Sequence, residues 1–224
     1  MADTPVPLNN VPVAAHPAVS DDGAVAAMAT ALMQSRQTIL PKRLGAPGPA
    51  PAELASIVNA AAHAPDHGQL LPWRFVLVPD AARPLLAEVF AQALLERDPG
   101  ATPEQCGQAR EKAFRAPVLM LVVVDGERGD PEIDLAERLL SAGCAVQNML
   151  LMATAQGYGS ALTSGKALTS VALRTLFALQ PHERALCFVS IGSVLTAKAA
   201  RQRPAPAQYV SVLQPGVGTQ PLMP

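Results

Sequence analysis

The sequence predicts a mixed fold of helices and strands, α+β or α/β, in which a small sheet is flanked by helices. Two observations support this prediction. Segments with helical hydrophobic periodicity alternate with short apolar runs of the kind that form strands. Alanine, valine and leucine dominate a composition with only 4% aromatic residues, which favours a helix-rich fold over an all-β sandwich. The 224 residues are enough to bury a sizeable core in one domain.

The helices and strands follow from local signals along the chain. Helices are expected at about residues 22–34, 51–64, 81–96, 102–115, 132–156 and 169–178, and strands at about 74–78, 118–124, 160–163 and 185–191. Asp21 or Asp22 can cap the first helix, and Pro51 stands at a good first helical position with Glu53 in the first turn of the second. Thr102 and the three residues after it form a helix start of capping-box type.

The two most apolar segments are expected in the core. Residues 118–124 read Val-Leu-Met-Leu-Val-Val-Val, which is typical of a strand covered on both faces. The helix at 132–156 ends at Gly157 and is apolar or small on nearly every side, so we expect it to be buried. In a small domain, a helix that is apolar all round often implies a subunit interface. Gln147 and Asn148 interrupt its apolar run, which is also short for a bilayer, so no membrane span is expected.

Both ends of the chain differ from the middle. Residues 1–22 are rich in proline, alanine and asparagine, lack the features of a signal peptide and are expected to be disordered. Residues 23–194 form the expected domain. Residues 195–224 are rich in proline without periodicity, and we expect an extended arm that crosses a surface of this chain or of a partner.

Charge and cysteine content narrow the possible partners. The net charge is −1 and no basic cluster occurs, so no nucleic-acid partner is expected. The chain has an odd number of cysteines, and their spacing does not match that of metal ligands; they are Cys106, Cys144 and Cys187. Cys144 and Cys187 lie in apolar segments, where reduced core thiols are expected, and this suits a cytoplasmic protein.

The junction between the second helix and the first strand holds two histidines, an aspartate and the only tryptophan. In one interpretation, His63 and His67 donate hydrogen bonds to a polar ligand while Pro65 and the backbone wall a flat ring. In the other, Asp66 and His67 cap a local turn and Trp73 packs in the core. No serine or cysteine nucleophile motif accompanies them, so no catalytic side chain is predicted. The four histidines also lack the spacing of metal ligands.

Three further segments are candidates for binding. Arg36-Gln37-Thr38 follows the first helix, where a guanidinium and hydroxyl suit a phosphate, although a solvated helix end explains them as well. The glycine-rich residues 157–165 leave the long helix and can offer free N–H groups to a ring, or form a simple turn. They are not a dinucleotide motif, which follows a strand and opens a helix. Arg201 and Arg203 follow the last strand and suit either a phosphate or the surface.

Together and in this order, these segments resemble the nitroreductase superfamily, and most of all its short branch with an Ala-Pro-Asp-His loop followed by Pro-Trp-(Arg/His)-Phe. The resemblance covers about residues 25–194 and includes the run Ser-Ala-Gly-Cys-Ala-Val at 141–146. It implies an α+β fold with a small central mixed sheet flanked by helices. It also implies a homodimer with a long buried interface helix and two FMN sites, each built from both subunits.

The resemblance also implies which residues bind FMN. The phosphate segment falls on Arg36, Gln37 and Thr38, and the C-terminal phosphate contacts on Arg201 and Arg203. The family's arginine before Ala-Pro is replaced by His63, and its next histidine falls on His67. The Trp-Arg-Ser that lines the flavin falls on Leu162, Thr163 and Ser164. Arginine is therefore missing at positions 37, 63 and 163.

The function implied is reduction of a small-molecule electron acceptor, nitroaromatic or quinone-like, by NAD(P)H through bound FMN in a ping-pong hydride transfer. The missing arginines suggest an alternative, a flavin-binding or carrier protein of the same fold without nicotinamide-driven turnover. A third hypothesis is a helical interaction module without a ligand, suggested by the apolar helix and the proline-rich tail.

Overall fold

The computed structural model describes residues 22–197, 199 and 202–222. The expected disorder of residues 1–21 and the predicted role of Arg201 lie outside these residues. The helices are α1 (Asp22–Ser35), α2 (Pro51–Asn59), α3 (Arg83–Arg97), α4 (Pro103–Glu111), α5 (Leu135–Ala155) and α6 (Val171–Leu176). The strands are β1 (Leu44–Gly45), β2 (Trp73–Leu77), β3 (Val118–Asp125), β4 (Gly159–Thr163), β5 (Glu183–Val194), β6 (Ser211–Gln214) and β7 (Gly218–Pro221).

One five-stranded sheet organises the domain. Its order is β1-β5-β3-β2, and β4 also pairs with β5. All ladders in the described part of this sheet are antiparallel. The predicted sheet was mixed, with parallel as well as antiparallel pairs. In the described residues, the parallel pairing is one isolated bridge between Thr38 and Ser160. Strands from distant parts of the chain meet in antiparallel pairs beside helices, so the fold is α+β, as predicted.

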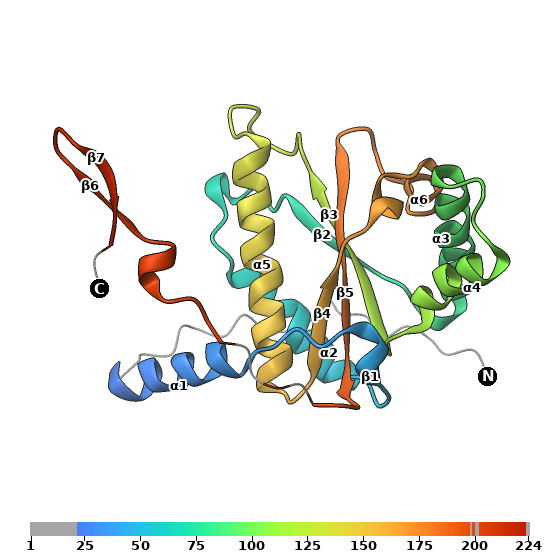
Figure 1. Cartoon of the computed structure of the whole chain (residues 1–224), viewed down its shortest axis with the longest axis horizontal. Helices are drawn as coiled ribbons and strands as arrows, with labels where there is room; N and C mark the ends of the chain where they lie inside the picture. The colour runs from blue at the N-terminus through green and yellow to red at the C-terminus, as the bar shows by residue number, and fades with distance from the viewer. Residues whose placement is uncertain (1–21, 198, 200–201, 223–224) are drawn as a thin grey trace.

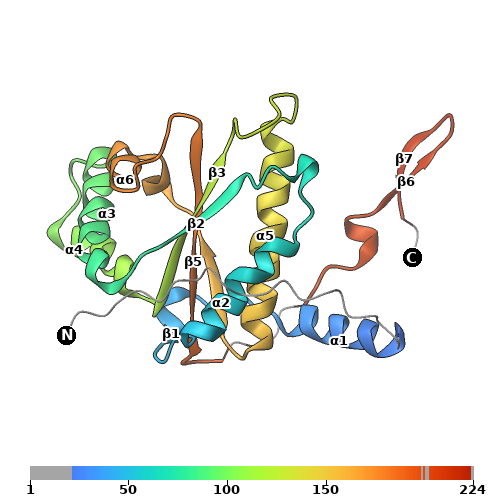
Figure 2. The ribbon, with the colours of Figure 1, turned by 180° about the vertical axis from the view of Figure 1, so that it is seen from behind.

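Strand β3 is buried on both faces of the sheet, as the apolar run predicts. Its alternate side chains enter two separate cores, because successive residues of a strand point to opposite faces. Met120, Val122 and Val124 belong to the core beneath α2 and α5. Leu121 and Val123 belong to the core beneath α3 and α6. Figures 1 and 2 show these two helical layers on either side of the central strands.

The helix caps follow the local sequence. The hydroxyl of Thr102 accepts from the N–H of Gln105, whose side chain accepts from the N–H of Thr102 at 2.8 Å, so the predicted capping box begins α4. Asp134 caps α5 by accepting from the N–H of Glu137 at 3.0 Å. At its other end α5 stops before Gly157, whose φ of +85° is left-handed and suits glycine.

Helix α5 is not buried on every side within one chain, and the subunit interface expected on one of its sides stays a prediction. Eight of its residues, among them Ala142, Ala145 and Met149, are buried against the sheet. On the opposite side Gly143 and Gln147 are exposed, and Leu140 keeps 70% of its surface open. A leucine this exposed on an otherwise apolar helix leaves one face of α5 without a partner in the single chain.

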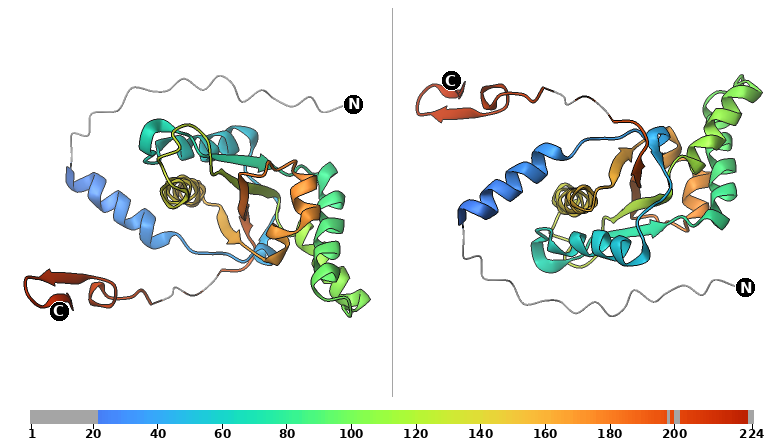
Figure 3. Two further views of the ribbon diagram at one scale, coloured as in Figure 1. Left: turned by 90° about the horizontal axis from the view of Figure 1, so that it is seen from above. Right: turned by 90° about the horizontal axis from the view of Figure 1, so that it is seen from below.

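Both ends of the described chain extend past α5. Figure 3 shows α1 and the hairpin of β6 and β7 on the side of α5 away from α3 and α4. The C-terminal residues, expected to form an extended arm, contain a 3-10 turn (Pro206–Gln208) and this hairpin. Tyr209 and Leu213 are exposed there. An isolated two-stranded hairpin is marginally stable in water.

The sequence predicted that Trp73, Cys144 and Cys187 lie in the core. Trp73 is a core residue with 6% exposure. Cys106 is the buried thiol, whereas Cys144 and Cys187, which were expected in the core, are only partly buried. Among residues 22–197, 199 and 202–222, no helix is long and apolar enough to cross a membrane.

Candidate functional site

The segment after α1 is joined to strand β4. Thr38 forms the parallel bridge with Ser160, and the N–H of Ile39 donates to the carbonyl of Ser160 at 2.9 Å. Arg36 and Gln37 are half-buried and Thr38 is exposed. The buried side chain of Ile39 anchors the segment in a small core with Leu44. A guanidinium, an amide and a hydroxyl are thereby held beside the start of β4.

The C-terminal arm returns to the same segment. Nη2 of Arg203 donates to the carbonyl of Arg36 at 3.1 Å, although the two residues are 167 positions apart. Both side chains remain at least partly exposed. The structure therefore places two of the predicted cationic residues together, while Arg201 is outside the described residues.

Strand β4 provides the next predicted group. Leu162 and Thr163 pair with β5, and Ser164 follows at the strand end. Leu162 is 44% exposed, Thr163 is half-buried and Ser164 is exposed. These residues lie on the strand whose first half bonds the Arg36 segment, so the predicted phosphate and ring segments are neighbours.

Tight packing fixes the beginning of β4. A Cβ at Gly159 would lie 2.7 Å from a methyl of Val194, 2.8 Å from Leu44 and 3.1 Å from Ile39, so only glycine fits there. Tyr158 donates its hydroxyl proton to Glu53 at 2.7 Å, which ties the turn before β4 to the start of α2. This hydrogen bond and the N–H of Ala50 lower the pKa of Glu53, and the same bond raises the pKa of Tyr158.

The two histidines lie along α5 between Glu137 and Asn148. His63 lines a cavity of about 400 Å³ between the loop after α2 and one side of α5. The other lining residues are Pro65, Leu139, Leu140, Gly143, Cys144, Gln147 and Asn148. Nδ1 of His67 lies 2.6 Å from Oε2 of Glu137 in the first turn of α5. Both predicted histidines are exposed and available to a ligand.

For the loop around His67, the local interpretation is confirmed for Asp66 and Trp73, and the ligand interpretation stays a prediction. Asp66 caps the local turn, since its Oδ2 accepts from the N–H of Leu71 at 2.6 Å. The turn contains Gln69 and Leu71 with φ of +51° and +49°, a conformation that costs free energy for residues other than glycine. The histidine beside this turn nonetheless points to a carboxylate of another element rather than into the core.

The predicted site residues thus form two groups. Arg36, Gln37, Thr38 and Arg203 gather beside the start of β4, and the two histidines lie along α5 between Glu137 and Asn148. Glu137 lies 18 residues before the last residue of α5, about 27 Å along the helix axis, so His67 is distant from the first group within one chain. Side chains of the described residues form no group of three or more His, Cys, Asp or Glu that could hold a metal ion.

Sequence reasoning missed several residues of this region. The sequence did not single out Glu137, because its partner His67 is 70 positions away. Gln147 and Asn148 were noted only as breaks in an apolar run, yet both line the cavity with Cys144. Periodicity indicates which side of a helix is polar but not which loop faces it.

Comparison with known proteins identifies the family. Residues 34–193 match the family model described as "Nitroreductase family". A protein of Haemophilus influenzae named "Putative NAD(P)H nitroreductase" is 35% identical over 161 residues, which cover 72% of this chain and 86% of that protein.

Solved structures share the fold. A nitroreductase-like family protein from Bacillus cereus superposes with a TM-score of 0.71 at 16% identity, covering 83% of this chain and 95% of that one. A Bacteroides fragilis nitroreductase with bound FMN gives 0.62 at 16% identity, covering 83% and 98% of the two chains. The family match spans the sheet, α5 and most of the predicted site residues, so this chain belongs to the nitroreductase family.

Proposed function

We propose that this protein is an FMN-dependent oxidoreductase in which NAD(P)H reduces the flavin and an electron-poor acceptor, nitroaromatic or quinone-like, is then reduced in a ping-pong cycle. Family membership supports the proposal, as do the NAD(P)H nitroreductase name of the Haemophilus relative and the FMN bound in the Bacteroides structure. The observation that carries it is the junction of Arg36, Thr38 and Arg203 beside β4.

The residues at this junction fit the phosphate end of FMN. Two guanidinium groups and a hydroxyl can neutralise and bond a phosphate, which carries close to two negative charges. Ser160 supports the fit, because its hydroxyl is buried and has no hydrogen-bond partner in the structure. Arg36, Gln37, Thr38 and Arg203, with Arg201 from outside the described residues, would hold the phosphate.

The residues at the end of β4 and the two histidines fit the ring. Leu162, Thr163 and Ser164 would line the flavin with an apolar side chain, two hydroxyls and the backbone, and His63 and His67 would form hydrogen bonds to it. FMN supplies the capacity to accept and donate a hydride, so no side-chain nucleophile or acid–base pair is required. The task of the protein is to bind, orient and shield the ring.

We place this site at a homodimer interface. The exposed face of α5 around Leu140 and Gly143 would be covered by the same face of a second copy. A twofold axis makes such an interface isologous, and an axis perpendicular to α5 would run the two α5 helices antiparallel. The N-terminal half of one α5 then faces the C-terminal half of the other. This arrangement brings the histidines of one subunit toward the phosphate group of its partner.

One observation favours a second function. Positions 37, 63 and 163 hold glutamine, histidine and threonine, so less positive charge faces the ring or the phosphate. A reduced, anionic flavin is stabilised by nearby positive charge. The alternative function is therefore a flavin-binding or carrier protein that is not turned over by nicotinamide.

A visible spectrum of the purified protein tests both functions. The enzyme should show an oxidised-flavin spectrum, or acquire one with added FMN, and should bleach with NADH or NADPH without oxygen. An added nitroaromatic or quinone should then restore the absorbance. Flavin that binds but stays oxidised with both nicotinamides would favour the carrier. Failure to bind FMN would reject both functions.

A further inference from the structure

The contact between His67 and Glu137 joins the loop after α2 to the first turn of α5. Oε2 of Glu137 lies 2.6 Å from Nδ1 of His67. The backbone of Glu137 is fixed by the Asp134 cap, so its carboxylate projects from the first turn of α5. A carboxylate is favourable at this end of a helix. The acceptor is therefore held by a rigid element rather than by another loop.

An ionised carboxylate has no proton to donate, which determines the state of the imidazole. The hydrogen in this contact must belong to Nδ1 of His67, because the Glu137 oxygen can only accept. The partner of one imidazole nitrogen sets the tautomer of the ring. Nε2 is then the unprotonated nitrogen, so His67 accepts a hydrogen bond from a ligand there, in place of the donor role that the sequence suggested.

The loop that carries His67 is constrained from its other side as well. Asp66 closes the turn onto Leu71, and Gln69 and Leu71 adopt left-handed φ values. Backbone strain of this kind persists only where the surrounding structure enforces it. The Glu137 contact adds little to stability, since the side chains of His67 and Glu137 are 65% and 48% exposed and water screens the pair. Its geometric effect on the histidine is thus larger than its effect on folding.

We propose that Glu137 is a positioning residue of the flavin site: it holds His67 in the Nδ1–H tautomer and presents Nε2 to the bound cofactor. The inference rests on the proposed function, in which His67 contacts FMN. Glu137 does not itself touch the cofactor. Its role is to fix which nitrogen of His67 does so, and in which direction the ring faces.

Nitrogen-15 NMR of the FMN-free protein, labelled at histidine, tests the tautomer without any activity. The variant H67N assigns the His67 signals among the four histidines. Above the titration range of the imidazole, the natural protein should show protonated Nδ1 at His67. E137A should shift His67 to the Nε2–H tautomer that free imidazole side chains prefer, whereas E132A should not. Glu132 is an exposed glutamate of the segment before α5 and makes a suitable control.

Binding of FMN to the same proteins tests the consequence. E137A should weaken FMN binding about fivefold to tenfold, as expected when a hydrogen bond that orients a ligand contact is lost. E137Q keeps an acceptor oxygen at the same place and should restore most of the affinity. The thermal midpoints of E137A and E132A should agree, because the contact is exposed.

The outcomes distinguish a failure of this inference from a failure of the proposed function. Natural protein that fails to bind FMN would reject the proposed function. Natural protein that binds FMN while His67 is in the Nε2–H form would overturn the role of Glu137 alone. The same conclusion follows if E137A changes the tautomer but leaves the FMN dissociation constant unaltered.

Discussion

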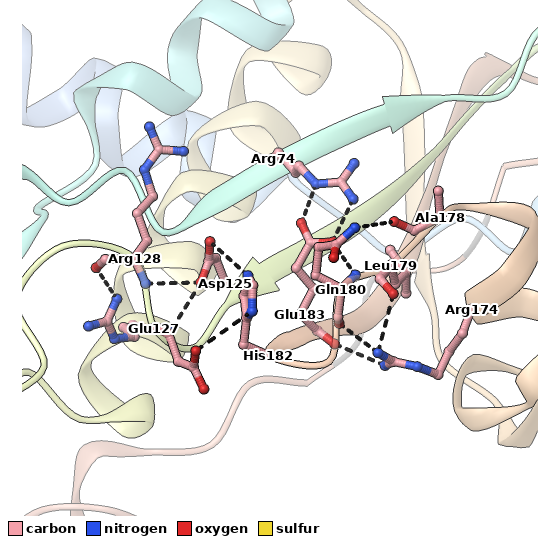
Figure 4. Close-up of polar contacts among 11 residues, drawn as sticks. Arg74, Asp125, Glu127, Arg128, Arg174, Ala178, Leu179, Gln180, His182 and Glu183 are labelled. Carbon is pink, nitrogen blue, oxygen red and sulfur yellow. Dashed lines mark hydrogen bonds and ion pairs between the residues drawn. The ribbon is translucent and has the colours of Figure 1, made fainter.

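Arg74 and Glu183 are joined by two hydrogen bonds that cross a strand. Nε and Nη2 of Arg74, on β2, lie 2.6 and 3.0 Å from the Glu183 carboxylate at the start of β5, although β3 runs between these strands (Figure 4). Glu183 also accepts from the N–H of Gln180 at 2.9 Å. One carboxylate therefore links the outer strand of the sheet to the turn before β5.

Replacing Glu183 should destabilise the fold in a pH-dependent way. E183Q removes the charge from a side chain that is only 9% exposed, and a loss of about 1–3 kcal/mol in the free energy of unfolding is expected at pH 7. Arg74 lowers the pKa of Glu183, and the Gln180 N–H adds to this against the effect of burial. A depressed pKa in the folded state gives stability that is present above the unfolded value of about 4.3 and lost as the pH falls through the folded value.

Urea unfolding at pH 7 and at pH 3 measures this effect. The difference between E183Q and the natural protein should shrink at the lower pH, because Glu183 of the unfolded chain is protonated there and its charge contributes less to stability. E88Q is the matched control, because Glu88 pairs with Arg110 on the surface and should contribute much less. Equal losses at both pH values would show that the charge of Glu183 is not what matters.

Gly159 should tolerate no side chain. The added methyl of G159A would lie under 3 Å from carbons of Val194 and Leu44, which overpacks the region at a typical cost of about 1–3 kcal/mol. Because Ile39 also lies at 3.1 Å, the segment that carries Arg36 should shift, and FMN binding should weaken with stability. Thermal unfolding and FMN titration measure the two effects.

G165A is the control for this substitution. A Cβ at Gly165 meets no heavy atom within 4 Å, so stability should change little. If G159A were as stable as G165A, the close packing at the start of β4 would not limit side-chain size.

Local sequence patterns predicted much of the fold. The Val-rich run at 118–124 predicted β3 with both faces buried, since only a strand between two layers is apolar at every position. The Thr102 capping box and the stop at Gly157 set helix ends through contacts within a few residues. The sequence did not predict the strand order, because β4 and β1 both pair with β5 through contacts between residues far apart in the sequence.

The candidate site was predicted less completely. The resemblance assigned Arg36 and Arg203 to one phosphate, but no local pattern predicted their contact within one chain, since nothing local brings the C-terminal arm back to α1. The sequence predicted a subunit interface along α5 but not which of its faces, because apolar composition alone cannot separate a face covered by the same chain from one covered by a partner. Leu140 shows the difference, as it is apolar and yet 70% exposed.

The exposed face of α5 should control assembly. L140E places a charge at the centre of the proposed dimer interface, where an unpaired buried charge is strongly unfavourable, so dimers should dissociate to monomers. Multi-angle light scattering during size-exclusion chromatography measures the mass. L85E changes another exposed leucine, on α3, and should leave the dimer intact. A natural protein that is monomeric at all concentrations would contradict the interface itself.

Cys187 should be inert in the folded protein. Burial raises the pKa of its thiol to about 11 from an ordinary value of 9.0. At pH 8 the thiolate, which is the reactive form, is then about 100-fold scarcer than in the unfolded chain. Alkylation by iodoacetamide, followed by mass spectrometry of the Cys187 peptide, should be slower by at least this factor without urea than with it. Equal rates would mean that the thiol is open to solvent.

Arg36 should bind the phosphate of FMN rather than its ring. R36Q should raise the dissociation constant of FMN about 10-fold to 100-fold, the effect expected for a lost hydrogen bond to a charged group. Riboflavin has no phosphate, so its affinity should not change between R36Q and the natural protein. K42Q removes an exposed cation a few residues away and should leave both ligands unaffected, which excludes a general effect of charge. Fluorescence quenching during titration measures each constant. Equal weakening of FMN and riboflavin by R36Q would instead mean that Arg36 maintains the shape of the segment before β4.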